Sequence, residues 1–209
     1  MALYISRYCR IRLNSEEKDQ VMIKTFDTES VENKDAASLY KRFSLEYPKY
    51  FKMDQVSRYG ILAAECMFKG YDWQQKYSGT EVGIVLADAF GSLDTDMEFQ
   101  KTIQSGDNFF PSPAIFVYTL SNIVMGEICI RYKIKGENMF FMSGRLDAFL
   151  LSDYVTGLFD HKNIKAALTG WVDYINGQPE ILLIFVENQP VNQQTNMQFN
   201  KKTIELLYS

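Results

Sequence analysis

The sequence predicts an α/β protein in which helices cover a mostly buried sheet. Segments with strand character alternate along the chain with segments of helical spacing, and this alternation is typical of layered α/β domains. The segment Glu81–Ala89 (EVGIVLADA) is apolar on both faces, as expected for a strand that is covered from both sides. The 209 residues are enough for one such domain with a buried core.

The composition is that of an ordinary globular protein, with 46% hydrophobic and 23% charged residues. The net charge is −4 and the cationic residues are dispersed, so we expect no nucleic-acid partner. No apolar run approaches the ~20 residues that span a bilayer. Basic residues soon interrupt the apolar amino terminus, so we expect no signal peptide and a cytoplasmic location.

The cysteine and histidine content limits the chemistry that the chain can perform. Cys9, Cys66 and Cys129 lie in apolar contexts without metal-binding spacing, so we expect buried free thiols and no metal site. His161 is the only histidine, which excludes a catalytic device that needs two. It follows Asp160 in a predicted loop, and we interpret it as a surface residue. No cofactor is expected.

The chain is predicted to begin with a strand. Leu3–Leu13 is rich in β-branched and aromatic residues, and simple alternation places Leu3, Ile5 and Ile11 near one face. The charge-rich segment that follows is predicted to be loop, with a short strand at Val21–Phe26.

Two helices are predicted next. The weaker one covers Lys34–Tyr47 and is ended by Pro48. The stronger one follows Asp54, a suitable amino-terminal cap, and its apolar residues recur at helical spacing up to Lys69. Gly70 is the predicted stop.

A glycine turn and a long helix are predicted after the buried strand. The turn Gly91–Asp96 lacks the spacing of a phosphate-binding loop, so we interpret it as structural, with Ser92 or Asp94 capping a helix through Ile103. A cation held by Asp94 and Asp96 is the alternative. The apolar residues from Pro111 to Tyr132 predict one central helix of about 30 Å. Gly126 within it suggests that another backbone approaches closely.

The last third of the chain is predicted to hold five further elements. They are the strand Asn138–Met142, the helix Leu146–Phe159, a hairpin of Ile164–Ile175 with Glu180–Val186, and a final edge strand at Thr203–Tyr208. Between the first two lies the turn Met142–Arg145. A turn that follows a strand and opens a helix is where an α/β protein often places a nucleophile, but this one contains no cysteine.

Four segments carry a resemblance to a known family. They are Met53–Ala64, Val82–Leu86 with Gly91-Ser92, Asn122–Ile128 with Lys135-Gly136, and Ala166–Asp173. In this order they resemble the amino-terminal half of the β-ketoacyl-acyl-carrier-protein synthases, over about two thirds of the chain. The resemblance implies a layered α/β/α thiolase-like half with a mixed, mostly buried sheet. Residues 1–209 would form a single domain, with 180–209 as a remnant of the second half.

The departures from the family pattern concern the catalytic residues. The family's nucleophilic Cys should fall within Met142, Ser143, Gly144 and Arg145, and none of these is a Cys. Ser143 is the only nucleophile type there, and no base is evident. The family's two histidines belong to the second half, most of which is missing here. We therefore expect no catalytic residues and no condensation activity of the family's kind, although other activity stays open.

The resemblance implies a role as a partner. Family members pair through the strand before the nucleophile, which here corresponds to Asn138, Met139, Phe140, Phe141 and Met142. Members that lost the Cys act as chain-length-factor-like partners of an active synthase. We therefore expect a homodimer, or a heterodimer with a full-length ketosynthase, in fatty acid, polyketide or aryl polyene type biosynthesis.

Three interpretations stay open beside this one. Arg145 could contact the phosphate of a carrier-protein prosthetic group, or could simply face solvent or a salt-bridge partner. Acyl carrier protein would in the first case be a second partner. The chain could also be a homodimeric scaffold without a pathway partner, or a thioester hydrolase or acyltransferase that uses Ser143.

Overall fold

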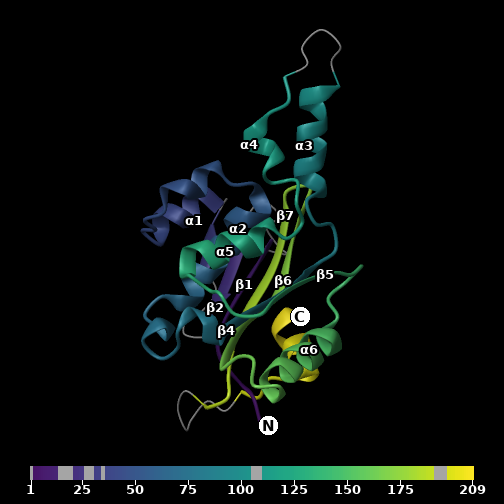
Figure 1. Ribbon diagram of the computed structural model, residues 1–209. Helices are drawn as coiled ribbons and strands as arrows, with labels where there is room; N and C mark the ends of the chain where they lie inside the picture. Colours follow the sequence, from purple (N-terminus) through teal and green to yellow (C-terminus); the bar gives the residue numbers. More distant parts are fainter. Residues whose placement is uncertain (1, 14–20, 26–30, 34–35, 105–109, 191–196) are drawn as a thin grey trace.

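The computed structural model describes residues 2–13, 21–25, 31–33, 36–104, 110–190 and 197–209. These residues form a sheet with helices on both faces (Figure 1). The strands are β1 (Tyr4–Leu13), β2 (Val21–Thr25), β3 (Val31–Asn33), β4 (Val82–Asp88), β5 (Asn138–Met142), β6 (Ala166–Ile175) and β7 (Gln178–Glu187). The helices are α1 (Ala36–Arg42), α2 (Gln55–Phe68), α3 (Leu93–Ile103), α4 (Pro113–Phe116), α5 (Ile123–Tyr132), α6 (Ala148–Asp160) and α7 (Lys201–Tyr208).

The sheet is mixed, and its strand order is β3-β2-β1-β7-β6-β4-β5. Strand β4 runs parallel to β5 and β6, whereas β7 runs antiparallel to β6 and β1. Strand β5 therefore ends the sheet on one side. The predicted layered α/β/α class with a mixed, buried sheet is confirmed.

Alternation along β4 explains why the strand is apolar throughout. Ile84 and Leu86 pack into the core that contains α2 and α5, while Val85 and Ala87 pack into the core beneath α6 and α7. All seven residues of β4 are buried. A strand with an apolar layer on each side needs apolar residues at both phases of its alternation.

Helix α2 confirms the predicted capping signals. The side chain of Asp54 accepts a hydrogen bond from the backbone N–H of Ser57 (3.1 Å). Gly70, just beyond the helix, has φ +74°, a conformation that glycine adopts without steric cost.

The single helix predicted for Pro111–Tyr132 is wrong, because the chain leaves the helical path after α4. The hydroxyl of Thr119 donates to the carbonyl of Phe116 (2.8 Å), and α5 starts only at Ile123. Among the described residues outside the helix's own backbone, no atom lies within 4 Å of a Cβ built at Gly126, so none of them approaches that position closely.

The predicted edge strand Thr203–Tyr208 is also wrong, since Lys201–Tyr208 forms helix α7. The side chain of Asn200 accepts a hydrogen bond from the N–H of Thr203 (3.0 Å), which caps the helix. Ile204 and Leu207 are buried on one face. The predictions of a strand at Val21–Phe26 and of a helix at Lys34–Tyr47 were right in type. Strand β2 covers Val21–Thr25, with Phe26 outside the described residues, and α1 is shorter than the predicted helix.

The thiols are free, as expected: Cys9 and Cys66 are buried, and Cys129 is partly buried. Burial raises the pKa of the Cys129 thiol to about 11. Within the described residues, no helix is long and apolar enough to cross a membrane.

A buried carboxylate fixes the end of β7 to the segment before β4. Glu187 is 2% exposed and accepts hydrogen bonds from the hydroxyls of Tyr71 and Tyr77, the latter at 2.8 Å. The ammonium group of Lys76 lies 3.5 Å from the same carboxylate. Burial, together with the bonds to Glu187, raises the pKa of both tyrosines well above the usual range.

Glu187→Ala is expected to lower the free energy of unfolding by about 3 kcal/mol, because the buried hydroxyl of Tyr71 and the partly buried hydroxyl of Tyr77 lose their acceptor. Tyr77→Phe removes one donor only and should cost about 1 kcal/mol. Urea unfolding of both variants measures this difference. Equal stability of Glu187→Ala and wild type would contradict the assignment of this network.

Candidate functional site

The turn that corresponds to the nucleophile position lies between β5 and α6. The N–H of Ser143 donates to the backbone carbonyl of Asp88 (2.8 Å), which continues the ladder between β5 and β4. The Ser143 hydroxyl donates to the carbonyl of Arg145 (2.6 Å). Asp147 then caps α6 by accepting from the N–H of Leu150 (2.9 Å). The turn therefore has the expected position in the fold, and its hydroxyl serves the turn itself.

The histidine lies far from this turn. His161 follows the carboxyl end of α6, with its Nδ1 2.7 Å from the carbonyl of Gly157. A helix of 13 residues is about 20 Å long. His161 therefore cannot reach Ser143 as a base, which counts against the serine-dependent alternative.

Arg145 is exposed and lines the same cleft as a second cation, Lys201. A cleft of about 410 Å³ is lined by the turn, the start of α6 and two residues of α7, Lys201 and Glu205. Lys201 and Glu205 form an ion pair at 3.7 Å. The proposed contact between Arg145 and a carrier phosphate stays a prediction.

Strand β5 presents an unpaired edge to solvent. Ile84 donates to the carbonyl of Glu137 (2.8 Å), and the register places Ile84 beside Asn138, so odd-numbered residues of β5 bond to β4. The N–H and C=O groups of Asn138, Phe140 and Met142 therefore point away from the sheet. Among the described residues, no strand lies beyond them. Edges of this kind bind another strand readily.

The five side chains of β5 differ in how far they are covered. Asn138 and Met142 are exposed, and the three residues between them are half-buried. Phe140 packs against the core of α2 and α5, whereas Phe141 makes an edge-to-face contact with Tyr154 of α6 (ring centroids 5.2 Å apart). The two aromatic rings thus pack against the chain's own helices, and the free surface of β5 is its backbone edge with the side chains of Asn138 and Met142.

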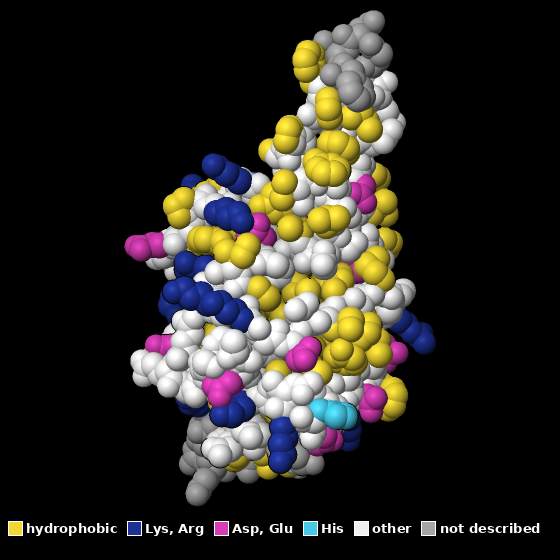
Figure 2. All heavy atoms as spheres, viewed as in Figure 1, with side chains coloured by type: hydrophobic (Ala, Val, Ile, Leu, Met, Phe, Trp, Pro, Cys, Tyr) yellow, Lys and Arg dark blue, Asp and Glu magenta, His cyan; other side chains and the backbone are white. Residues whose placement is uncertain are grey.

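Helices α3 and α4 project beyond the body of the molecule, and we call this pair the arm (Figure 1). Contact between the rings of Phe99 and Phe116 (5.4 Å) holds the two helices together. Figure 2 shows apolar side chains along the arm and again where β5 meets α6. The large exposed apolar residues there are Phe90, Leu93, Met97, Phe110, Phe116, Val117, Leu120, Met142 and Phe149. Exposed apolar surface on this scale is typical of a protein interface.

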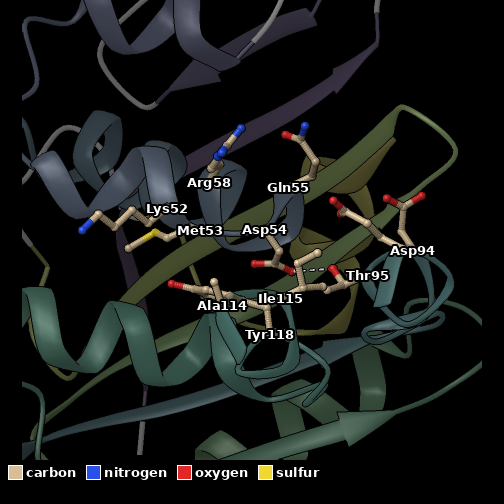
Figure 3. A pocket seen from close by; sticks show the side chains of 11 residues that line it. Lys52, Met53, Asp54, Gln55, Arg58, Asp94, Thr95, Ala114, Ile115 and Tyr118 are labelled. Carbon is tan, nitrogen blue, oxygen red and sulfur yellow. Dashed lines mark hydrogen bonds between the residues drawn. The ribbon is translucent and has the colours of Figure 1, made fainter. Parts of the chain in front are cut away.

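A cavity of about 270 Å³ lies at the base of the arm, between α2, α3 and α4. In Figure 3 the carboxylate of Asp54 points toward Thr95, while Lys52 and Arg58 point away from it. The hydroxyl of Thr95 donates to Asp54 (3.4 Å). Burial raises the pKa of Asp54 to about 6, although hydrogen bonds from Ser57 oppose this rise. The carboxylate of Asp54 thus caps α2 and also binds α3 of the arm.

Asp94 and Asp96, the alternative cation ligands, both accept hydrogen bonds within the protein. Asp94 accepts a hydrogen bond from the N–H of Asn176 (3.3 Å), and Asp96 accepts one from the Ser92 hydroxyl (3.0 Å). These contacts agree with the structural interpretation of the turn.

A pair of buried acids that sequence reasoning did not identify lies at the carboxyl ends of two neighbouring strands. Asp88 ends β4 and is 1% exposed, while Asp173 lies near the end of β6 and is 5% exposed. The signal was present, since each acid lies at or near the carboxyl end of an apolar strand. Their proximity depends on β4 and β6 being neighbours, which the chain order alone does not specify.

Comparison with family models finds no matching family, and comparison with curated proteins finds no match. Solved structures, in contrast, share the fold. The ishigamide ketosynthase/chain length factor matches with a TM-score of 0.59 and 18% identity, over 69% of this chain and 46% of that chain. A structure of the AntDE:AntF type II PKS acyl-carrier protein in complex with its ketosynthase matches with a TM-score of 0.62 and 11% identity, over 89% and 62%.

A third match is the ketosynthase ApeO in complex with its chain length factor ApeC from Xenorhabdus doucetiae. Its TM-score is 0.58 at 12% identity, over 100% of this chain and 90% of that chain. The chain thus spans less than two thirds of the length of the first two relatives and most of the third. At these identities the likeness concerns the fold. This chain has the fold seen in ketosynthase and chain-length-factor complexes, which confirms the resemblance found in the sequence.

Proposed function

We propose that this chain is a non-catalytic, chain-length-factor-like subunit that assists an active β-ketoacyl synthase. The observation that carries the proposal is the free edge of β5, the strand that leads into a turn without the family's nucleophilic cysteine. A strand that leads to a lost nucleophile is still needed if its edge binds a partner protein. Two of the similar structures are described as a ketosynthase with a chain length factor.

The geometry of the turn supports a role without catalysis. Ser143 donates its hydroxyl hydrogen within the turn, and the only histidine of the chain lies at the far end of α6. A nucleophile needs an adjacent base or a depressed pKa. Ser143→Ala should therefore leave any thioester hydrolysis by the purified chain unchanged.

The proposed partner is a full-length ketosynthase whose own edge strand pairs with β5. Residues Asn138 to Met142 would form the centre of the interface. Acyl carrier protein is a proposed second partner, and Arg145 with Lys201 would offer two cations to its phosphate. One similar structure holds an acyl-carrier protein with its ketosynthase.

The setting that fits this role is fatty acid, polyketide or aryl polyene type biosynthesis in the cytoplasm. We further propose that residues 1–209 form one domain, with 180–209 as a remnant of the second half of a synthase. Strand β7 lies between β1 and β6 in the middle of the sheet. The remnant would thus be retained because it completes the sheet.

Co-purification tests the proposal. The chain, carrying an affinity tag, is expressed together with a full-length synthase and an acyl carrier protein from the same gene neighbourhood. We expect the synthase to be retained with it in equal amount. A strictly monomeric chain that binds neither protein would contradict the proposal, and a stable pair of two identical chains that ignores the synthase would favour a homodimeric scaffold.

A further inference from the structure

The carboxyl groups of Asp88 and Asp173 lie at the base of the arm, and one turn is bonded to both. The N–H of Phe90 donates to Asp173 (3.2 Å), and the N–H of the next residue, Gly91, donates to Asp88. The same turn opens α3, since the N–H of Leu93 donates to the carbonyl of Phe90 (3.1 Å). The position of the arm therefore depends on how the two carboxyl groups are arranged.

One oxygen atom of the pair, on Asp88, lacks a hydrogen-bond partner among the described residues. This carboxyl oxygen is fully buried. A buried ionised oxygen without a partner is costly, and a second buried carboxylate nearby adds repulsion. A proton on the pair neutralises one carboxylate, which lowers the cost of the buried charge and removes the repulsion.

The charged groups around the pair do not relieve this repulsion. Glu180 of β7 and Tyr208 of α7 lie on the Asp173 side and bond to each other (2.7 Å), and Glu180 adds a further negative charge. Arg12 of β1 lines a cleft together with Asp173, yet its guanidinium donates to the carbonyl of Ser209 (2.9 Å). Strand β5 contributes the uncharged Met142 opposite Asp88, and Asp94 of α3 accepts from Asn176.

We propose that Asp88 and Asp173 form a proton-operated clamp at the base of the arm. While the pair holds a proton, the turn at Phe90–Ser92 stays fixed to the ends of β4 and β6. When both groups are ionised, the carboxylates separate, the turn loosens, and the arm gains freedom. The clamp does not depend on the proposed function. Its consequence for partner binding does, because the exposed apolar residues of the arm would then meet a partner in a pH-dependent way.

The direction of the pH dependence follows from the shifted ionisation. Burial, and secondly the charge of Asp173, raise the pKa of Asp88 to about 7, against an unperturbed value of about 3.9. Burial also raises the pKa of Asp173. Between about pH 4 and about pH 7 the unfolded chain has lost protons that the folded chain still holds. The stability contribution of the pair is therefore present at low pH and is lost as the pH rises to about 7.

Hydrogen exchange and thermal unfolding of the isolated chain test the clamp. Asp88→Asn mimics the protonated form, and Asp153→Asn removes an exposed carboxylate of α6 as the matched control. At about pH 8.5 the amides of residues 89–93 should exchange roughly tenfold faster in wild type than in Asp88→Asn, and at about pH 5.5 equally fast. The Tm advantage of Asp88→Asn should grow across the same range, whereas Asp153→Asn should follow wild type.

Asp173→Asn provides a second route if Asp88→Asn folds poorly. It removes the neighbouring charge, so the two groups can no longer repel each other, and residues 89–93 should lose most of the loosening that wild type shows at about pH 8.5. If Asp88→Asn and Asp173→Asn both show the same pH dependence of hydrogen exchange and of Tm as wild type, the clamp is wrong. Because these readouts use the chain alone, they remain decisive even if no synthase binds.

Discussion

Replacing Met142 with proline is expected to weaken binding of the partner synthase by roughly tenfold or more, while the chain stays folded. The N–H of Met142 points away from β4, because the odd-numbered residues of β5 make the bonds to that strand. Proline therefore removes a donor from the free edge without removing a bond of the sheet. Its ring also obstructs an approaching strand. Titration of the synthase with each variant, followed by light scattering, measures the change.

Met142→Ala is the matched control. The Met142 side chain is 56% exposed, so its loss should have little effect on folding, and alanine retains the N–H. We expect Met142→Ala to bind much more tightly than Met142→Pro. Equal, full-strength binding of both variants would show that the partner does not pair with this edge.

Gly170→Ala is expected to lower the free energy of unfolding by at least about 3 kcal/mol. Gly170 lies in β6 between β7 and β4, with φ +151°, where residues with a side chain are strained. A Cβ there would lie 1.8 Å from the backbone carbonyl oxygen of Leu182. No rotamer relieves a clash with backbone, so the ladder between β6 and β7 must shift.

Gly126→Ala tests the same substitution where the structure leaves room. Gly126 lies inside α5, and no described residue outside the helix's own backbone has an atom within 4 Å of the added Cβ. Alanine also favours a helix by about 0.5–1 kcal/mol. Urea unfolding should therefore show opposite signs for the two variants. A Gly170→Ala variant as stable as wild type would contradict the register of β6 and β7.

The sequence predicted correctly those elements whose residue pattern fits only one kind of secondary structure. The continuous apolar run of β4 requires burial on both faces, and Asp54 with Gly70 marks both ends of α2. The short apolar segment Asn138–Met142 predicted β5 before the turn at Met142–Arg145, and the resemblance implied that this is the strand through which the family pairs. The position of β5 at the edge of the sheet depends on the order of the strands, and the local sequence pattern does not encode this order.

The errors arise where tertiary contacts override a local pattern. Simple alternation placed Leu3, Ile5 and Ile11 near one face of β1. An irregularity between Ile5 and Arg7 instead shifts which residues face each side of the sheet. Ile5 therefore packs under α6 and α7, while Ile11 packs with α2. The apolar run before α5 looked like helix, yet Phe116, Val117 and Leu120 are exposed on and beside the arm. Such residues look like core in sequence because an interface and a core use the same side chains.

The solution mass of the chain, alone and with a full-length synthase from the same pathway, tests the central claim most directly. If β5 is an edge for a synthase, the mixture should contain one complex with the summed mass of both chains, and Met142→Pro should reduce it. A mixture in which each protein keeps the mass that it has alone would contradict the account.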